Sequence, residues 1–260
     1  MTTDALVTVD VPDGYVAERE RGAYIVALPS IMEMVQQAIT ESGTLFDWAA
    51  SRPGAREYTG RGSAWGVATP DGDWVVRHYR RGGAAARVLN DRYINAGATR
   101  PLIELTASVR ARNRGVATPE VVTAVVYAAG PTYRADLATR LVRDSADLAE
   151  SVLGPDRLDA AGRLAAWRAA GDLLRIAFAA GVEHADLNLR NILIQRSDAG
   201  TQAHLLDLDR AVVREQPVSQ VARSSMLQRL HRSRRKLETA AGGQTSSDEL
   251  EAFDAALLRG

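Results

Sequence analysis

The segment from residue 184 to residue 191 combines residue types suited to phosphoryl transfer. His184, Asp186 and Asn191 have the spacing H-x-D-x-x-x-x-N. This chemistry needs a carboxylate that accepts or orients a hydroxyl proton, and an oxygen ligand for the divalent ion that neutralises a triphosphate. A loop can bring Asp186 to the acceptor and Asn191 to the metal. We expect His184 to orient this loop; the alternative is a buried histidine satisfied by hydrogen bonds.

A second acidic pair follows at Asp207 and Asp209, directly after the apolar run 203–206. Mg²⁺ prefers hard oxygen ligands and generally keeps several waters, so one Asp and one Asn are sufficient protein ligands. We expect Asp207 to be the ligand, because it directly follows a predicted strand. Asp209 is either a second ligand or an ordinary loop residue. A D-x-D pair by itself is common on turns. The interpretation of this pair as part of a metal site depends on the 184–191 segment that precedes it.

The turn Gly60-Arg61-Gly62-Ser63 lies between two predicted short strands, 56–59 and 64–68. Glycines let backbone N–H groups approach phosphate oxygens, so Gly60, Gly62 and Ser63 are candidates for a phosphate-covering loop. Glycines also mark hairpins of every other kind. The P-loop motif G-x-x-x-x-G-K-S/T is absent, and the single lysine, Lys236, is far away in the sequence.

The elements that must position these residues change in type along the chain. We predict strands at 74–79, 121–127, 132–141, 192–194 and 203–206, and helices at about 99–112, 160–180 and 219–239. Strands with one helix therefore come first, and helices with a small hairpin follow. Segregated elements predict an α+β fold in two lobes. We expect an N-terminal extension (1–44), a β-rich nucleotide-binding N-lobe (45–143) and a helical C-lobe (144–260).

Composition excludes several classes of protein. The chain of 260 residues contains no cysteine, which excludes a disulfide framework, a cysteine nucleophile and cysteine-ligated zinc. The 32 basic residues equal the 32 acidic residues, and this balance gives no support to nucleic-acid binding. We find no signal peptide and no apolar run long enough to span a bilayer, so we expect a soluble protein, at most peripheral to a membrane.

The glycine turn, the 184–191 loop and Asp207, in this order, resemble the protein-kinase-like fold. A closer resemblance, over about 45–236, is to the lipopolysaccharide kinase family, in its branch that acts on 3-deoxy-D-manno-octulosonic acid (Kdo). The segments that carry it are Trp74–Gly83, His184–Asn188, Leu206–Arg210 and Leu227–Ser233. Arg-His-Tyr-Arg-Arg-Gly-Gly, within the first segment, is the part most particular to that family. Residues 1–44 and the tail after about 240 have no match.

The resemblance implies ATP-dependent phosphorylation of a Kdo sugar on a lipid A precursor, at the cytoplasmic face of the inner membrane. It implies that Asp186 is the catalytic aspartate and that Asn191 and Asp207 hold Mg²⁺. Asn188 falls where protein kinases have a catalytic-loop lysine, and the loss of that charge is compatible with an anionic sugar acceptor.

The resemblance also bears on two charged residues of the N-lobe. Arg77 falls where protein kinases have a strand lysine, and Glu104 matches the glutamate of their N-lobe helix. The guanidinium binds phosphate oxygens through a planar fork, so such a pair could hold the α- and β-phosphates of ATP. The alternative is that Arg77 faces solvent and Glu104 is an ordinary surface charge. The alternation of Val75 and Arg77 with Val76 and His78 does not settle which set faces inward.

Two basic regions are candidates for contact with an anionic glycolipid. Arg80 and Arg81 beside Gly82-Gly83 either recognise the carboxylates and phosphates of the acceptor or belong to a solvated loop. The segment 223–236 contains five arginines and Lys236 with an apolar leucine stripe. It either lies on an anionic membrane or packs its leucines on the C-lobe.

Two competing functions remain open at this point. One is another sugar or small-molecule phosphotransferase on the same fold, such as a heptose-directed lipopolysaccharide kinase, because fold does not fix substrate. The other is a non-catalytic nucleotide-binding pseudokinase scaffold, suggested by the missing strand lysine. The joint presence of Asp186, Asn191 and Asp207 argues against the scaffold, which has no need of a full set of metal and acceptor groups.

Overall fold

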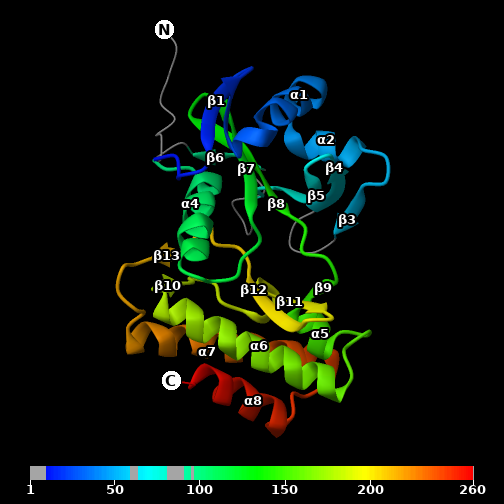
Figure 1. Cartoon of the computed structure of the whole chain (residues 1–260), viewed down its shortest axis with the longest axis vertical. Coiled ribbons are helices and arrows are strands. Elements are labelled where there is room, and N and C mark those ends of the chain that lie inside the picture. Colours follow the sequence, from blue (N-terminus) through cyan, green and yellow to red (C-terminus); the bar gives the residue numbers. More distant parts are fainter. Residues whose placement is uncertain (1–9, 59–63, 81–90, 95–96, 260) are drawn as a thin grey trace. The chain divides into compact units, whose positions relative to one another are not determined.

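The computed structural model describes residues 10–58, 64–80, 91–94 and 97–259 (Figure 1). The chain divides into two compact units. Unit 1 comprises Met1–Val109 and Glu120–Leu141, and unit 2 comprises Arg110–Pro119 and Val142–Gly260. Unit 1 contains the large sheet and unit 2 contains the long helices of the second half of the chain. The predicted α+β class, β-rich first and helix-rich second, is confirmed.

Unit 1 is built on one antiparallel sheet. Among the described residues this sheet has eight strands in the order β1-β2-β7-β8-β5-β4-β3, with β6 paired to β8. The strands are β1 (Val16–Glu20), β2 (Ala23–Ala27), β3 (Arg56–Tyr58), β4 (Ala64–Thr69), β5 (Gly72–His78), β6 (Tyr93–Ile94), β7 (Val121–Ala129) and β8 (Thr132–Arg140).

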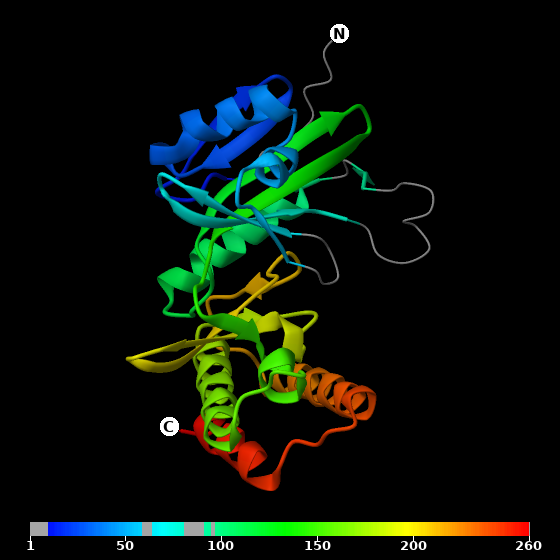
Figure 2. The same cartoon turned by 90° about the vertical axis from the view of Figure 1, so that its right-hand side faces the viewer.

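Both faces of this sheet are covered by helices (Figures 1 and 2). A short 3₁₀ turn η1 (Pro29–Ile31), α1 (Met32–Ser42) and α2 (Leu45–Ser51) pack on the face that carries Trp74 and Val76. Helix α4 (Arg100–Asn113) packs on the other face, where Leu105 and Leu137 belong to one buried apolar cluster. Arg77 pairs with Leu137 across β5 and β8 and so lies on the α4 face. Because helices cover both faces of the sheet, the polarity pattern of β5 alone could not show on which face Arg77 lies.

Residues 16–42 contribute to the core of unit 1. Strand β2 pairs with β7, with Ile25 opposite Val125, and β1 pairs with β2 at the edge of the sheet. Ile25 and Val35 are fully buried. The apolar stretch from Ala23 to Ile39 is therefore a strand, a turn and a helix that bury one face of the sheet.

Unit 2 is organised around the long helix α6 (Ala160–Ala179). Its remaining elements are β9 (Ser145–Asp147), α5 (Leu148–Leu153), β10 (Val182–Glu183), η2 (Leu189–Asn191), β11 (Ile192–Ser197), β12 (Gly200–Leu205), β13 (Val212–Val213), α7 (Gln220–Ala241) and α8 (Ser247–Leu257). Helix α8 packs closely on α6: a Cβ at Gly171 would clash with the carbonyl oxygen of Phe253. Trp167 meets the Phe253 ring edge-on at 5.7 Å between centroids. The C-terminal helix is thus part of the unit 2 core.

Two small sheets of unit 2 lead to the candidate site. The predicted hairpin is β11–β12, with Ile192 opposite Leu205, and β9 extends it. Strand β10 pairs with β13. No helix within the described ranges combines the length and apolarity needed to cross a bilayer.

Candidate active site

The 184–191 loop begins at a backbone position that only glycine suits. Gly181 has φ +76°, and a Cβ there would clash with the carbonyl oxygens of Arg214 and Gln216. The carbonyl oxygen of Gly181 accepts a hydrogen bond from the Arg214 backbone at 2.9 Å. This close approach allows β10 to pair with β13, which fixes the start of the loop.

His184 joins the loop to the segment that carries Asp207. The imidazole is buried, with an exposed fraction of 2%. Its Nε2 lies 2.9 Å from the carbonyl oxygen of Leu206, and its Nδ1 lies 3.2 Å from the backbone nitrogen of Asp186. A carbonyl oxygen only accepts and an amide N–H only donates, so these partners select the neutral tautomer protonated at Nε2. The structure therefore places His184 where it orients both segments.

Two amide side chains fold the loop around the backbone of Asp186. The Nδ2 groups of Asn188 and Asn191 each donate to the Asp186 carbonyl oxygen at 2.8 Å. The Oδ1 of Asn188 accepts from the Arg190 N–H at 3.0 Å and caps η2. Both ends of the buried Asn188 amide are thus used within the loop, whereas Asp186 is exposed. This arrangement uses the Asn188 side chain to hold the loop in shape and leaves Asp186 accessible.

Asn191 and Asp207 are adjacent through a backbone hydrogen bond. The Leu206 N–H donates to the Asn191 carbonyl oxygen at 2.9 Å. Asp207 has φ +60°, in the left-handed region that Asp tolerates better than most residues. The Nδ2 of Asn191 already donates to the Asp186 carbonyl oxygen, so its Oδ1 is the atom that can ligate a metal ion. One carboxylate and one amide oxygen fit Mg²⁺, which takes oxygen ligands and keeps waters. Asp209 is also partly exposed, and both expectations for it, a second ligand or an ordinary loop residue, stay open.

In unit 1, Arg77 and Glu104 form an ion pair within the α4 face of the sheet. Glu104 is nearly buried, and it also accepts a hydrogen bond from the Tyr79 hydroxyl. The Arg77 guanidinium lies over the Tyr79 ring, 4.8 Å from its centroid, and its NH2 reaches the Tyr79 hydroxyl at 3.4 Å. Arg77 therefore does not simply face solvent, and Glu104 is not a surface charge.

His78 belongs to a separate network on the opposite face of β5. Its Nδ1 lies 2.6 Å from the fully buried Asp136, and its Nε2 lies 3.1 Å from Asp91. The other oxygen of Asp136 accepts from the Tyr127 hydroxyl and the Phe46 N–H at 2.8 and 2.9 Å. Burial by itself lowers the pKa of His78, but the hydrogen bonds and charges of Asp136 and Asp91 raise it overall. Burial and the Asp136 charge raise the pKa of Tyr127 well above its usual range.

Four of the predicted site residues lie outside the described residues. They are Gly60, Gly62, Ser63 and Arg81. The strands that flank the glycine turn are described, and they pair with Tyr58 opposite Ala64. Arg80 is exposed beyond the end of β5.

Sequence reasoning missed two buried residues of unit 1: Tyr79, which binds Glu104 beside Arg77, and Asp136, which belongs to the separate His78 network. Tyr79 lies two positions after Arg77, and this spacing along an extended chain gives both side chains the same face. Asp136 is a single acidic residue between Ala135 and Leu137, all three of them buried. A lone acid in an apolar strand signals a paired buried charge. Both signals were therefore present in the sequence.

The sheet unit with its half-buried Arg77–Glu104 pair, and the helical unit with the Asp186–Asn191 loop and Asp207, define a phosphotransferase of the protein-kinase-like class. Residues 47–253 match the model of the Lipopolysaccharide kinase (Kdo/WaaP) family. The chain belongs to this family.

Individual relatives agree with this assignment. The chain is 39% identical over 202 residues to a 3-deoxy-D-manno-octulosonic acid kinase of Xanthomonas euvesicatoria pv. vesicatoria, covering 77% of this chain and 75% of the relative. It is 35% identical over 202 residues to a protein of the same name from Stenotrophomonas maltophilia, with the same coverage. The structure of WaaP in complex with acyl carrier protein has a TM-score of 0.54 at 18% identity, covering 91% of this chain and 89% of WaaP. That likeness concerns the fold.

Proposed function

We propose that this chain transfers the γ-phosphate of ATP to a hydroxyl group of a Kdo residue on a lipid A precursor, in the biosynthesis of the lipopolysaccharide core. The observation that carries the proposal is the bridge made by His184. It ties the backbone of Asp186 to that of Leu206, and so couples an exposed carboxylate to the Asn191 and Asp207 oxygens. The relatives named as Kdo kinases support the choice of acceptor.

In unit 2, each polar group has a distinct part in this reaction. Asp186 accepts the proton of the attacking hydroxyl, for which an exposed carboxylate held by its own backbone is suited. Asn191 and Asp207 hold Mg²⁺, which when bound neutralises the charge of the phosphate groups. His184 and Asn188 keep the loop in shape and have no direct contact with the reacting atoms.

In unit 1, Arg77 binds the α- and β-phosphates while Glu104 holds its guanidinium in place. The planar guanidinium offers two parallel N–H donors to phosphate oxygens, whereas a lysine offers a point charge. We assign the backbone of Gly60, Gly62 and Ser63 to the covering of the phosphates. Arg80 and Arg81 are proposed to attract the anionic acceptor.

The test is mass spectrometry of Kdo-bearing lipid A precursors after incubation with the protein, ATP and Mg²⁺. We expect one added phosphate with the wild type and none with Asp186→Asn. Asp198→Asn is the matched control, because Asp198 is an exposed residue of the β11–β12 turn. A phosphate added only to heptose-bearing acceptors would indicate the competing sugar kinase. Equal background turnover in wild type and Asp186→Asn would indicate a scaffold.

We also propose that α7 attaches the protein peripherally to the anionic cytoplasmic face of the inner membrane. Arg234 pairs with Glu238, and Arg223 lies over Phe178 and donates to a backbone carbonyl. The residues that remain exposed for lipid contact are Arg232, Arg235 and Lys236.

Flotation with anionic vesicles at low salt tests this attachment. Each basic residue near such a surface contributes about 1 kcal/mol, so replacing Arg232, Arg235 and Lys236 by Gln is expected to weaken binding about a hundredfold. Arg196→Gln, an exposed arginine of β11, is the control. Absence of wild-type binding at low salt would remove the proposal.

A further inference from the structure

A hollow of about 330 Å³ lies within unit 2 directly beside the catalytic loop. Its walls include His184 and Ala185, the two residues before Asp186. We call it the loop-side pocket. The other lining residues are Glu183, Arg210, Val212, Ala222, Ser225, Met226 and Arg229. A volume of this size is in the range of sites for small ligands. A ligand bound in this pocket would therefore contact the residues that directly precede Asp186 in the sequence.

The loop-side pocket carries two arginines that no carboxylate neutralises. Arg210 is exposed and has no hydrogen-bond or ion-pair partner among the described residues. Arg229 donates from NH1 to the Ser225 hydroxyl at 3.1 Å, while its Nε is buried without a partner in the described part of the chain. The one carboxylate that lines the pocket, Glu183, is paired with Arg214 at 2.7 Å. The pocket is therefore cationic.

We propose that the loop-side pocket binds the carboxylate of the acceptor sugar acid, with Arg210 and Arg229 as its ligands. This inference rests on the proposed function, since it assigns the acceptor subsite of the same reaction. A carboxylate matches the paired N–H donors of a guanidinium. It also gives the buried Nε of Arg229 the acceptor that it lacks. Met226 and Val212 supply an apolar surface for the carbon skeleton of the sugar.

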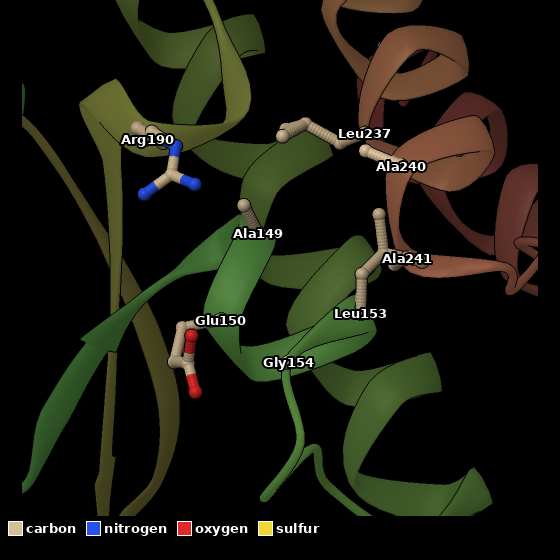
Figure 3. Close-up of a pocket in the computed structure, with 8 residues that line it drawn as sticks. All are labelled: Ala149, Glu150, Leu153, Gly154, Arg190, Leu237, Ala240 and Ala241. Atoms are coloured by element: carbon tan, nitrogen blue, oxygen red, sulfur yellow. The ribbon is translucent and has the colours of Figure 1, made fainter.

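A second hollow of unit 2, of about 210 Å³, is less suited to an anion (Figure 3). Its lining from α5 and α7 is mostly apolar, and its one arginine, Arg190, shares it with the carboxylate of Glu150. Figure 3 shows both charged groups on the side of the hollow away from α7. The two charges offset each other, so this hollow lacks the net positive charge of the loop-side pocket.

Steady-state kinetics with two forms of the acceptor test the assignment. The acceptors are a Kdo-bearing lipid A precursor and its Kdo carboxyl methyl ester, which cannot present a carboxylate. We expect Arg210→Gln and Arg229→Gln each to raise the KM for the acid about tenfold to a hundredfold, as the loss of a charged hydrogen bond implies. The KM for ATP should not change. With the ester, both variants should equal the wild type, and Arg196→Gln should equal the wild type throughout.

Two kinetic outcomes would contradict the proposal. A KM for the acid that is unchanged in Arg210→Gln would overturn the proposal, and this variant, at an exposed loop residue, leaves the core intact. The KM of the variants could stay raised with the ester, or could depend on the phosphates of the lipid and not on the carboxylate. Either result would assign the pocket to a phosphate.

Direct binding separates this inference from the proposed function. The Nε–H resonance of Arg229 in the 260-residue protein is followed by NMR during titration with free Kdo, its methyl ester or inorganic phosphate. A shift with free Kdo and not with the ester supports the pocket even if no phosphorylation is found. No shift, or an equal shift with phosphate, overturns it. Absence of phosphorylation with an intact NMR response would refute the proposed function alone.

Discussion

The Nε2 of His184 donates to the carbonyl oxygen of Leu206, the residue immediately before Asp207, across 2.9 Å. The same ring accepts from the Asp186 backbone N–H through Nδ1. One buried imidazole thus fixes the backbone beside the predicted proton acceptor and beside the predicted metal ligand. We therefore propose that the histidine acts through these two residues as a positioning residue and not as a general base.

We predict that His184→Phe lowers kcat and raises the Mg²⁺ concentration needed for half-maximal activity. The ring fills the space but leaves the half-buried Leu206 carbonyl and the Asp186 N–H without this partner, at a cost of about 1 kcal/mol each. His184→Gln keeps a donor towards Leu206 and should recover part of the Mg²⁺ response. Activity is titrated with Mg²⁺ at saturating ATP. Equal Mg²⁺ curves for Phe and Gln variants would show that the histidine does not act through Leu206.

A second prediction separates the two properties of Asp207. Asp207→Asn should abolish Mg²⁺-dependent turnover with an unchanged melting temperature, because Asn loses the charge but also tolerates φ +60°. Asp207→Ala should abolish turnover and also cost about 1 kcal/mol, because an alanine is strained in that conformation. Turnover is measured with Mg²⁺ titration, and stability by thermal unfolding. Wild-type turnover in the Asn variant would refute the ligand assignment.

The loop was predictable from the sequence because its chemistry is local. His184, Asp186 and Asn191 lie within eight residues of one another, and a polar segment between a helix and a strand already suggests their grouping. The bridge to Leu206 was not predictable, because a backbone carbonyl leaves no trace in residue types. The same holds for the loop-side pocket, whose two arginines come from different elements, the loop after β12 and helix α7.

The sheet illustrates a different limit. Alternation along β5 reports burial only where one face is exposed to solvent, and here α1 and α2 cover one face and α4 covers the other. The orientation of Arg77 was therefore decided by pairing with Leu137, which is a contact between strands far apart in sequence. Likewise, only tertiary pairing with β7 shows that β2 belongs to the sheet.

A third prediction concerns the group that holds Arg77. Tyr79→Phe removes the hydroxyl that binds Glu104 and keeps the ring beneath the guanidinium. We expect a loss of stability of about 1–3 kcal/mol, the usual cost for a hydrogen bond to a charged group, and a higher KM for ATP. Denaturant unfolding and ATP kinetics measure the two effects. A higher KM for the sugar acceptor alone would contradict the role assigned to this tyrosine.

Arg77→Lys gives a fourth prediction. The charge survives and still pairs with Glu104, but the planar fork is lost. We therefore expect kcat/KM for ATP to fall about tenfold to a hundredfold without being abolished, whereas Arg77→Ala should leave only background activity. Steady-state kinetics at varied ATP provide the measurement. Full activity in the lysine variant would mean that the guanidinium geometry is not used on the phosphates.

The last prediction is a pH dependence of the stability of unit 1 that His78 controls. Burial opposes its charge, but Asp136 and Asp91 outweigh burial and raise its pKa in the folded state above 6.5. The charged histidine consequently stabilises the fold fully below its unfolded-state pKa, and this contribution is lost as the pH rises through the higher folded-state pKa.

The His78→Gln variant isolates this contribution, because glutamine keeps a donor near Asp136 and does not titrate. Denaturant unfolding from pH 5.5 to 9 gives the difference in stability between wild type and variant at each pH. This difference cancels the opposite contributions of His204 and His231, whose pKa values are lowered, first by burial and then by nearby arginines. We expect the wild-type advantage to be largest at acidic pH and to shrink as the pH rises. An advantage that grew with pH would mean that His78 is buried in its neutral form.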